Sequence, residues 1–185
     1  DAEEKRLLDA IGSLSDLPIY IDDTPIQGVV EMRGKARRLQ SERGIDLLIV
    51  DYLQLIEPED KSAPREQQIA LITRRLKALA KELNVPVIAL AQLNRGVEHR
   101  EDKRPRLSDL RESGAIEQDA DVIMMIHRED YYHQGDKEYE STHEAELIIA
   151  KQRNGPTATV KLLFNEKTTR FNSLATDFAS DSTSF

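Results

Sequence analysis

Polar side chains directly follow two apolar runs of the sequence, and they are the first candidates for chemistry. Asp51 follows residues 47–50, and Gln92 follows residues 85–90 with only Ala91 between. A carboxylate at the end of an apolar strand has the form of a Walker B residue and can hold the Mg²⁺ of a nucleotide, usually through water. A neutral amide in the neighbouring position can donate to a phosphate and accept from a water or a loop. Loop capping is the alternative explanation for both side chains.

Two cations separated by one residue stand at a predicted hairpin. Lys151 and Arg153 flank Gln152, and side chains two positions apart on a strand point the same way, so both can reach outward together. Two cations at the end of a sheet suit the γ-phosphate of a nucleotide on a neighbouring subunit, as an arginine finger does. Protection of an edge strand by charge explains the same pair, and the residues alone favour it.

A local excess of positive charge suggests contact with nucleic acid. Between Arg95 and Arg111 the chain has six basic and four acidic residues. Arg111 and the backbone N–H groups around Gly114 could hold a sugar-phosphate backbone without reading its sequence. Residues 95–114 contain no Phe, Tyr or Trp, so phosphate tracking is a better explanation than base stacking. A solvated loop with a glycine-terminated helix is the alternative.

Composition and missing motifs exclude other classes of protein. The chain has 185 residues, 39% hydrophobic and 32% charged, with 26 Lys and Arg against 34 Asp and Glu, which indicates one soluble domain with a net charge of −8. Without cysteine there is no disulfide or thiolate site, which fits a cytoplasmic location. The four histidines lack metal-site spacing. A phosphate-binding loop of the form G-x-x-x-x-G-K-[ST] is missing, because Val29 stands where the first glycine before Gly34-Lys35 should be.

The elements that must position these residues alternate between strands and helices. Apolar stripes and caps predict helices over residues 3–14, from Thr24-Pro25 to Gly44, along Ile69, Ile72, Leu76, Leu79 and Leu83, and over 116–120. Short apolar runs predict strands over residues 19–21, 47–50, 85–90 and 122–126, and an Asn154-Gly155 hairpin over 145–151 and 157–164. The expected fold class is therefore α/β, with an open parallel sheet flanked by helices and finished by antiparallel strands.

Four long segments then carry a resemblance that the separate patterns do not. In chain order they read LLIVDYLQL at 47–55, VPVIALAQLNR at 85–95, DLRESGAIEQDAD at 109–121 and IAKQRNG at 149–155. Together they resemble successive motifs of the bacterial replicative DNA helicase of the DnaB type. The resemblance covers the chain from about Leu14 to Phe171, and four motifs in the right order make it specific.

This resemblance implies a RecA-like ATPase domain that assembles as a homohexamer, encircles single-stranded DNA and moves 5′ to 3′ on ATP and Mg²⁺. Asp51 would then hold Mg²⁺, and Gln92 would link the nucleotide to the DNA loops. Lys151 and Arg153 would act on the adjacent subunit's nucleotide. The DNA-tracking loop would match Arg111, Glu112 and Gly114. Primase and a helicase loader are the partners expected of the full-length protein, which would be cytoplasmic and not membrane-bound.

The resemblance also sets the expected boundaries. Residues 1–172 would form the carboxyl-terminal part of the motor domain, a partial P-loop NTPase core, and residues 173–185 a flexible tail. In the family, the Walker A loop and the catalytic glutamate precede the position that matches Asp1, so this segment would not hydrolyse ATP by itself. Two alternatives stay open: another RecA-like motor, such as a recombinase or a clock-type ATPase, and a non-enzymatic module that binds DNA or a partner.

Overall fold

The computed structural model describes residues 2–110, 113–133, 135–136 and 138–174, and every structural statement below concerns these residues. Helices and strands follow one another as α1 (Ala2–Ser15), α2 (Val29–Glu42), β1 (Leu48–Val50), α3 (Arg65–Leu83), β2 (Val87–Ala89), α4 (Ser113–Asp119), β3 (Val122–His127), β4 (Glu144–Gln152), β5 (Ala158–Asn165) and β6 (Arg170–Ser173). None of the described helices is long and apolar enough to cross a membrane. Of the tail expected over residues 173–185, Ser173 ends β6, and residues 175–185 lie outside the described residues.

The strands form two sheets. β1 and β2 pair in parallel, with Val50 opposite Ala89, and β3 to β6 form an antiparallel sheet in chain order. The α/β fold class is confirmed, but the parallel part of the described fold has only two strands. The third predicted strand, β3, pairs antiparallel with β4. Its side chains alternate between exposed and buried, as expected for a strand that packs against a core on one face only.

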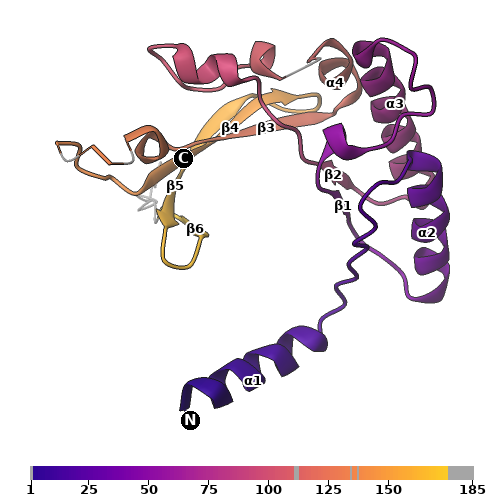
Figure 1. The fold of residues 1–185 in the computed structure, drawn as a ribbon, viewed down its shortest axis with the longest axis horizontal. Coiled ribbons are helices and arrows are strands. Elements are labelled where there is room, and N and C mark those ends of the chain that lie inside the picture. Colours follow the sequence, from indigo (N-terminus) through magenta and orange to yellow (C-terminus); the bar gives the residue numbers. More distant parts are fainter. Residues whose placement is uncertain (1, 111–112, 134, 137, 175–185) are drawn as a thin grey trace, which may run out of the picture.

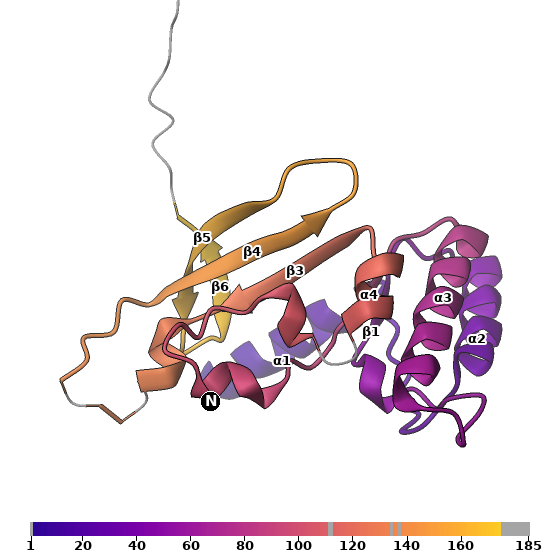
Figure 2. The ribbon, with the colours of Figure 1, turned by 90° about the horizontal axis from the view of Figure 1, so that it is seen from above.

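Helix α3 provides the centre of the packing. All five residues of its predicted apolar stripe are buried, and Ile69 and Leu79 are the largest side chains with almost no exposure. One core joins Ile69, Ile72 and Leu76 to residues of β1 and β3, and a second joins Leu79 and Leu83 to α2. Figures 1 and 2 both show α2 and α3 side by side next to β1. This packing holds the carboxyl ends of β1 and β2 in place.

The amino-terminal part differs from the sequence-based expectation. Residues 19–21 are extended but pair with no strand in the described chain, and Ile21 is 86% exposed. The following helix begins at Val29 rather than after Thr24-Pro25. The carboxylate of Asp22 accepts hydrogen bonds from the N–H and hydroxyl of Thr24, which turns that segment locally instead of starting a helix.

Helix α1 forms as predicted, but its apolar face is uncovered. Figure 1 shows α1 apart from the other elements, at the end of an extended connection. Leu7, Leu8, Ile11 and Leu14 are each more than half exposed. The apolar stripe thus correctly predicted that α1 is a helix, but α1 does not bury this stripe against the rest of the described chain.

The hairpin follows its prediction closely. β4 and β5 pair antiparallel, and the turn between them contains Asn154 and Gly155. Because β4 lies between β3 and β5, it is an inner strand of its sheet. β5 pairs with β4 only as far as Ile149, so Lys151 and Arg153 lie beyond that pairing, and protection of an edge strand stays an alternative for them.

Candidate nucleotide and DNA site

Asp51 and Gln92 come after two adjacent parallel strands. Strand pairing continues past β1, since the N–H of Leu90 donates to the carbonyl oxygen of Val50 and the N–H of Leu53 donates to that of Leu90, each at 2.9 Å. Asp51 and Gln92 are both exposed, and neither side chain makes a hydrogen bond or ion pair with the described residues. The loop-capping alternative therefore has no hydrogen bond to support it. Both groups remain available to a ligand at the carboxyl end of the sheet.

A third side chain, Gln54, joins the loops that carry these two residues. Its Oε1 accepts a hydrogen bond from the backbone N–H of Gln92 at 3.2 Å. Its Nε2 is buried without a hydrogen-bond partner in the described structure. Gln92 also lines a cavity of about 320 Å³ together with Leu93, Asn94 and Arg95. This edge therefore offers a free carboxylate after β1 and, after β2, a free amide that lines a hollow.

The donor set at this edge fits a nucleotide-bound Mg²⁺ only in part. A free, exposed carboxylate such as that of Asp51 is the oxygen ligand that Mg²⁺ takes in proteins, directly or through water. The sequence contains no phosphate-binding loop to hold the nucleotide itself. The described residues can thus supply the metal side of a nucleotide site.

Lys151 and Arg153 lie at the far end of β4, where it meets α4. Residues 122 and 123 of β3 pair with Gln152 and Lys151, and only two residues separate α4 from β3, so the end of the helix is brought beside both cations. The ammonium of Lys151 donates to the carbonyl oxygens of Glu117 and, at 2.8 Å, Ala120. The guanidinium of Arg153 donates to the carbonyl oxygen of Gln118 at 2.9 Å. Both side chains thus bind the carboxyl end of α4.

The predicted DNA-tracking residues are only partly described. Arg111 and Glu112 lie outside the described residues, and Gly114 is exposed in the first turn of α4. Much of the basic charge before them is paired: Arg100 with Asp109 at 2.7 Å, Arg106 with Asp102 at 2.8 Å, and Arg104 with Glu146. Asp102 and Asp109 are already among the four acidic residues counted from the sequence, so only the ion pair of Arg104 with Glu146 further reduces the charge available to a phosphate backbone.

Comparison with known proteins identifies the family of the chain. The family described as "DnaB-like helicase C terminal domain" matches residues 1–173. The chain belongs to the DnaB-like helicase C-terminal domain family. It is 53% identical to the replicative DNA helicase DnaC of Bacillus subtilis and 52% identical to DnaB of Geobacillus stearothermophilus. Each of these matches covers 94% of this chain and 38% of the relative, so the chain spans less than half of their length.

Solved structures give the same result for the DnaB-like fold. One solved ATPase domain is 46% identical, with a TM-score of 0.86, and the match covers 94% of this chain and 61% of that chain. A DnaB-like replicative helicase, whose structure concerns its interactions with primase, is also 46% identical, with a TM-score of 0.85 and coverages of 94% and 42%. The expectation that the fold is that of a DnaB-type ATPase domain is confirmed.

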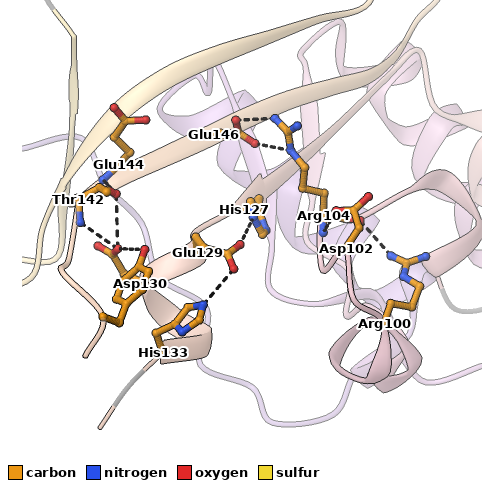
Figure 3. Close-up of polar contacts among 11 residues, drawn as sticks. Arg100, Asp102, Arg104, His127, Glu129, Asp130, His133, Thr142, Glu144 and Glu146 are labelled. Atoms are coloured by element: carbon orange, nitrogen blue, oxygen red, sulfur yellow. Dashed lines mark hydrogen bonds and ion pairs between the residues drawn. The ribbon is translucent and has the colours of Figure 1, made fainter. Parts of the chain in front are cut away.

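Away from these residues, a cluster of polar side chains in the DnaB-like chain holds the loop between β3 and β4 in place (Figure 3). The buried carboxylate of Asp130 accepts hydrogen bonds from the hydroxyls of Ser141 and Tyr139 and from the N–H groups of Thr142 and His143. Burial acts to raise the pKa of Asp130, but these hydrogen bonds outweigh it and lower the pKa to about 2. Possible ligand atoms of Asp130, His143 and Glu166 lie within 4.8 Å of one another. Because both oxygens of Asp130 already accept hydrogen bonds, its carboxylate acts as an anchor for the loop.

Glu129 links two histidines in the same region. Its carboxylate contacts Nε2 of His127 at 3.1 Å and Nε2 of His133 at 3.2 Å, as Figure 3 shows. His127 is buried, and the ring of His133 stacks on that of Tyr139 at 4.1 Å between centroids. These contacts give His127 and His133 a structural role in the packing of this region.

Sequence reasoning missed three residues that organise the candidate site. Gln54 bridges the two strand ends, Asp121 contacts Arg153, and Lys77 of α3 contacts Asp121. Gln54 and Asp121 lie within two of the four family-like segments, which was a usable signal. Lys77 is one of several charged residues on α3, so nothing in the sequence distinguished it.

Proposed function

We propose that this chain is the carboxyl-terminal part of the motor domain of an ATP-dependent, hexameric replicative DNA helicase that unwinds DNA by moving 5′ to 3′ on one strand. The observation that carries the proposal is the free carboxylate of Asp51 at the end of β1, tied through Gln54 to the strand end that bears Gln92. The membership of the chain in the DnaB-like family supports it. The names of the relatives, replicative DNA helicases, support the reaction.

In this proposal, the residues divide between two sides of a subunit interface. Asp51 orients Mg²⁺, which when bound neutralises charge on the phosphates of ATP. Gln92 contacts the nucleotide and responds to its state through the loop shared with Gln54. Lys151 and Arg153 bring positive charge to the nucleotide of the adjacent subunit, where preorganised cations stabilise the charge of phosphoryl transfer. Hydrolysis then depends on assembly, and the segment alone, without a phosphate-binding loop, does not turn over ATP.

The DNA side rests on the loop that precedes α4. Arg111, Glu112 and Gly114 would follow the sugar-phosphate backbone of single-stranded DNA. Primase and a loader are the protein partners that the proposal adds for the full-length protein. A related structure concerned with primase interactions supports the first of these partners.

Replacement of the proposed arginine finger tests the function. In the full-length hexamer that carries this chain, Arg153→Ala should slow ATP hydrolysis at least roughly a hundredfold, because a cation at the transferring phosphoryl group is lost. Nucleotide binding should be largely kept. Arg38→Ala is the matched control, since Arg38 is a 77% exposed arginine on α2, away from β4. Near-normal hydrolysis in Arg153→Ala would contradict the assignment.

A further inference from the structure

The cations assigned to the neighbouring nucleotide are held at the carboxyl end of α4. The last carbonyl groups of a helix have no partner within the helix and carry partial negative charge. Here Lys151 and Arg153 satisfy the carbonyl groups of Glu117, Gln118 and Ala120. The carbonyl groups at the end of this seven-residue helix thus bind two side chains from the end of β4. We call this set of contacts the α4 frame.

Asp121 completes this frame. Its carbonyl oxygen accepts the backbone N–H of Arg153 at 2.8 Å, and its Oδ1 lies 3.6 Å from Nη1 of the same arginine. Its other carboxylate oxygen contacts the ammonium of Lys77 on α3. The hydrogen bond from Lys77 is the main cause that lowers the pKa of Asp121, and attraction to Arg153 and Lys151 lowers it further. One residue therefore contacts both the backbone and the guanidinium of Arg153.

The frame leaves part of each cation free. A guanidinium has five N–H donors and an ammonium has three. The contacts with α4 and Asp121 engage only Nη1 and Nη2 of Arg153, whose side chain is 52% exposed. Lys151 uses two of its three donors. These bonds therefore fix where the cations lie without using up their capacity to bind a phosphate.

We propose that Asp121 is a positioning residue for Arg153, which it holds against the end of α4 in the orientation that meets the nucleotide of the adjacent subunit. The inference rests on the proposed function and gives Asp121 a role that none of the site residues predicted from the sequence has. Phosphoryl transfer depends on placement more than on covalent chemistry, so a cation that swings freely stabilises the transition state less than one held in place. Asp121 contacts no substrate and acts only through Arg153.

Replacement of the carboxylate by a neutral amide tests this role in the full-length hexamer. Asp121→Asn should lower kcat for ATP about tenfold, with KM changed less than about twofold, because the lost interaction matters in the transition state. A second readout does not use turnover: fluorescent mant-ADP with aluminium fluoride, which mimics the transferring phosphoryl group, should be retained less well than in the unmodified protein. Binding of mant-ADP alone should be unchanged. Turnover is counted per assembled hexamer, so that loss of assembly does not imitate loss of positioning.

Lys77→Met separates the two contacts of Asp121, because it removes the contact with α3 but leaves Asp121 beside Arg153. It should lower kcat and retention of the aluminium fluoride complex less than Asp121→Asn does. Asp46→Asn is the matched control, because Asp46 is exposed and its carboxylate makes no hydrogen bond with the described residues, and it should leave both unchanged. If Lys77→Met imitates Asp121→Asn, Asp121 serves only to fasten α4 to α3, and the inference is wrong. Asp121→Glu, which keeps the charge, should recover most of the lost turnover, and a lack of recovery would also overturn the inference.

The outcome separates this inference from the proposed function. If Arg153→Ala itself leaves hydrolysis unchanged, the proposed function fails and Asp121 has nothing to position. If Arg153→Ala slows hydrolysis while Asp121→Asn turns over normally, the function stands and only the positioning role is wrong.

Discussion

The side chains assigned to the nucleotide differ in how firmly the fold holds them. Asp51 and Gln92 are placed only by the ends of their strands, since their side chains bond to none of the described residues. Lys151 and Arg153, in contrast, are bound to the carbonyl end of α4. A carboxylate that reaches a metal through water tolerates some freedom, whereas a long cation that must meet a neighbour's phosphate loses considerable side-chain entropy unless it is already held.

At the same scale, Asp130 should stabilise the loop between β3 and β4 in a pH-dependent way. Its pKa of about 2 is below the ordinary 3.8, so its contribution to folding is present above about pH 4 and is lost as the pH falls towards 2. Asp130→Asn leaves donors without an acceptor and should lower the free energy of unfolding by about 1–3 kcal/mol at pH 7, and by less at pH 3. Urea titrations of the full chain at both pH values measure this.

The control for this prediction is Asp46→Asn. Asp46 is exposed, and its carboxylate makes no hydrogen bond with the described residues. Its replacement should therefore leave the urea midpoint unchanged at both pH values. A loss at pH 7 that is equally large at pH 3 would show that Asp130 acts through packing rather than through its charge.

Among the elements, α3 connects the core to the site. Its buried side packs on β1, whose end carries Asp51, and its Thr73 hydroxyl donates to the carboxylate of Asp119 in α4 at 2.6 Å. Lys77, one turn further along, reaches Asp121. A single helix therefore positions both the strand ends and the α4 frame.

A cavity created by substitution on the buried face of α3 should accordingly destabilise the fold. Leu79 is 1% exposed, and Leu79→Ala should lower the free energy of unfolding by about 2–5 kcal/mol, because transfer and cavity costs add. Ile26→Ala removes a similar apolar side chain that is 65% exposed and should cost less than about 1 kcal/mol. Thermal or denaturant unfolding compares the two, and equal losses would mean that α3 is not the packing centre.

Sequence patterns predicted best those elements whose own residues carry the signal for the structure that they form. The stripe of α3 and the Asn154-Gly155 turn carry their own periodicity or turn chemistry, and both were confirmed. Residues 19–21 were wrongly predicted as a strand, because a strand also needs a partner, which apolar character cannot reveal. The strand over 122–126 was confirmed, and it pairs with the first of the antiparallel strands that finish the fold. In the candidate site, residue types indicated Asp51, Gln92, Lys151 and Arg153. The contacts made by Gln54, Asp121 and Lys77 could be seen only in the three-dimensional structure.

For the molecule as a whole, the proposed site is divided between two subunits. Asp51 and Gln92 lie at the end of the parallel sheet, and Lys151 and Arg153 at the junction of β4 with α4, and no described hydrogen bond or ion pair joins the two groups. In a ring of identical subunits, each interface joins one face to a different face of the next copy. The two groups of residues then meet only between neighbours, which makes hydrolysis a property of the ring.

The most direct test of this division is to mix two inactive full-length variants and measure ATP hydrolysis. Arg153→Ala subunits keep Asp51, and Asp51→Asn subunits keep Arg153, so a mixed ring contains roughly a quarter of interfaces in which both groups are intact. Hydrolysis should therefore return when the two are assembled together, although neither variant is active alone. If the mixture is no more active than its separate components, Arg153 and Asp51 act within the same subunit, and the division of the site between neighbouring subunits is wrong.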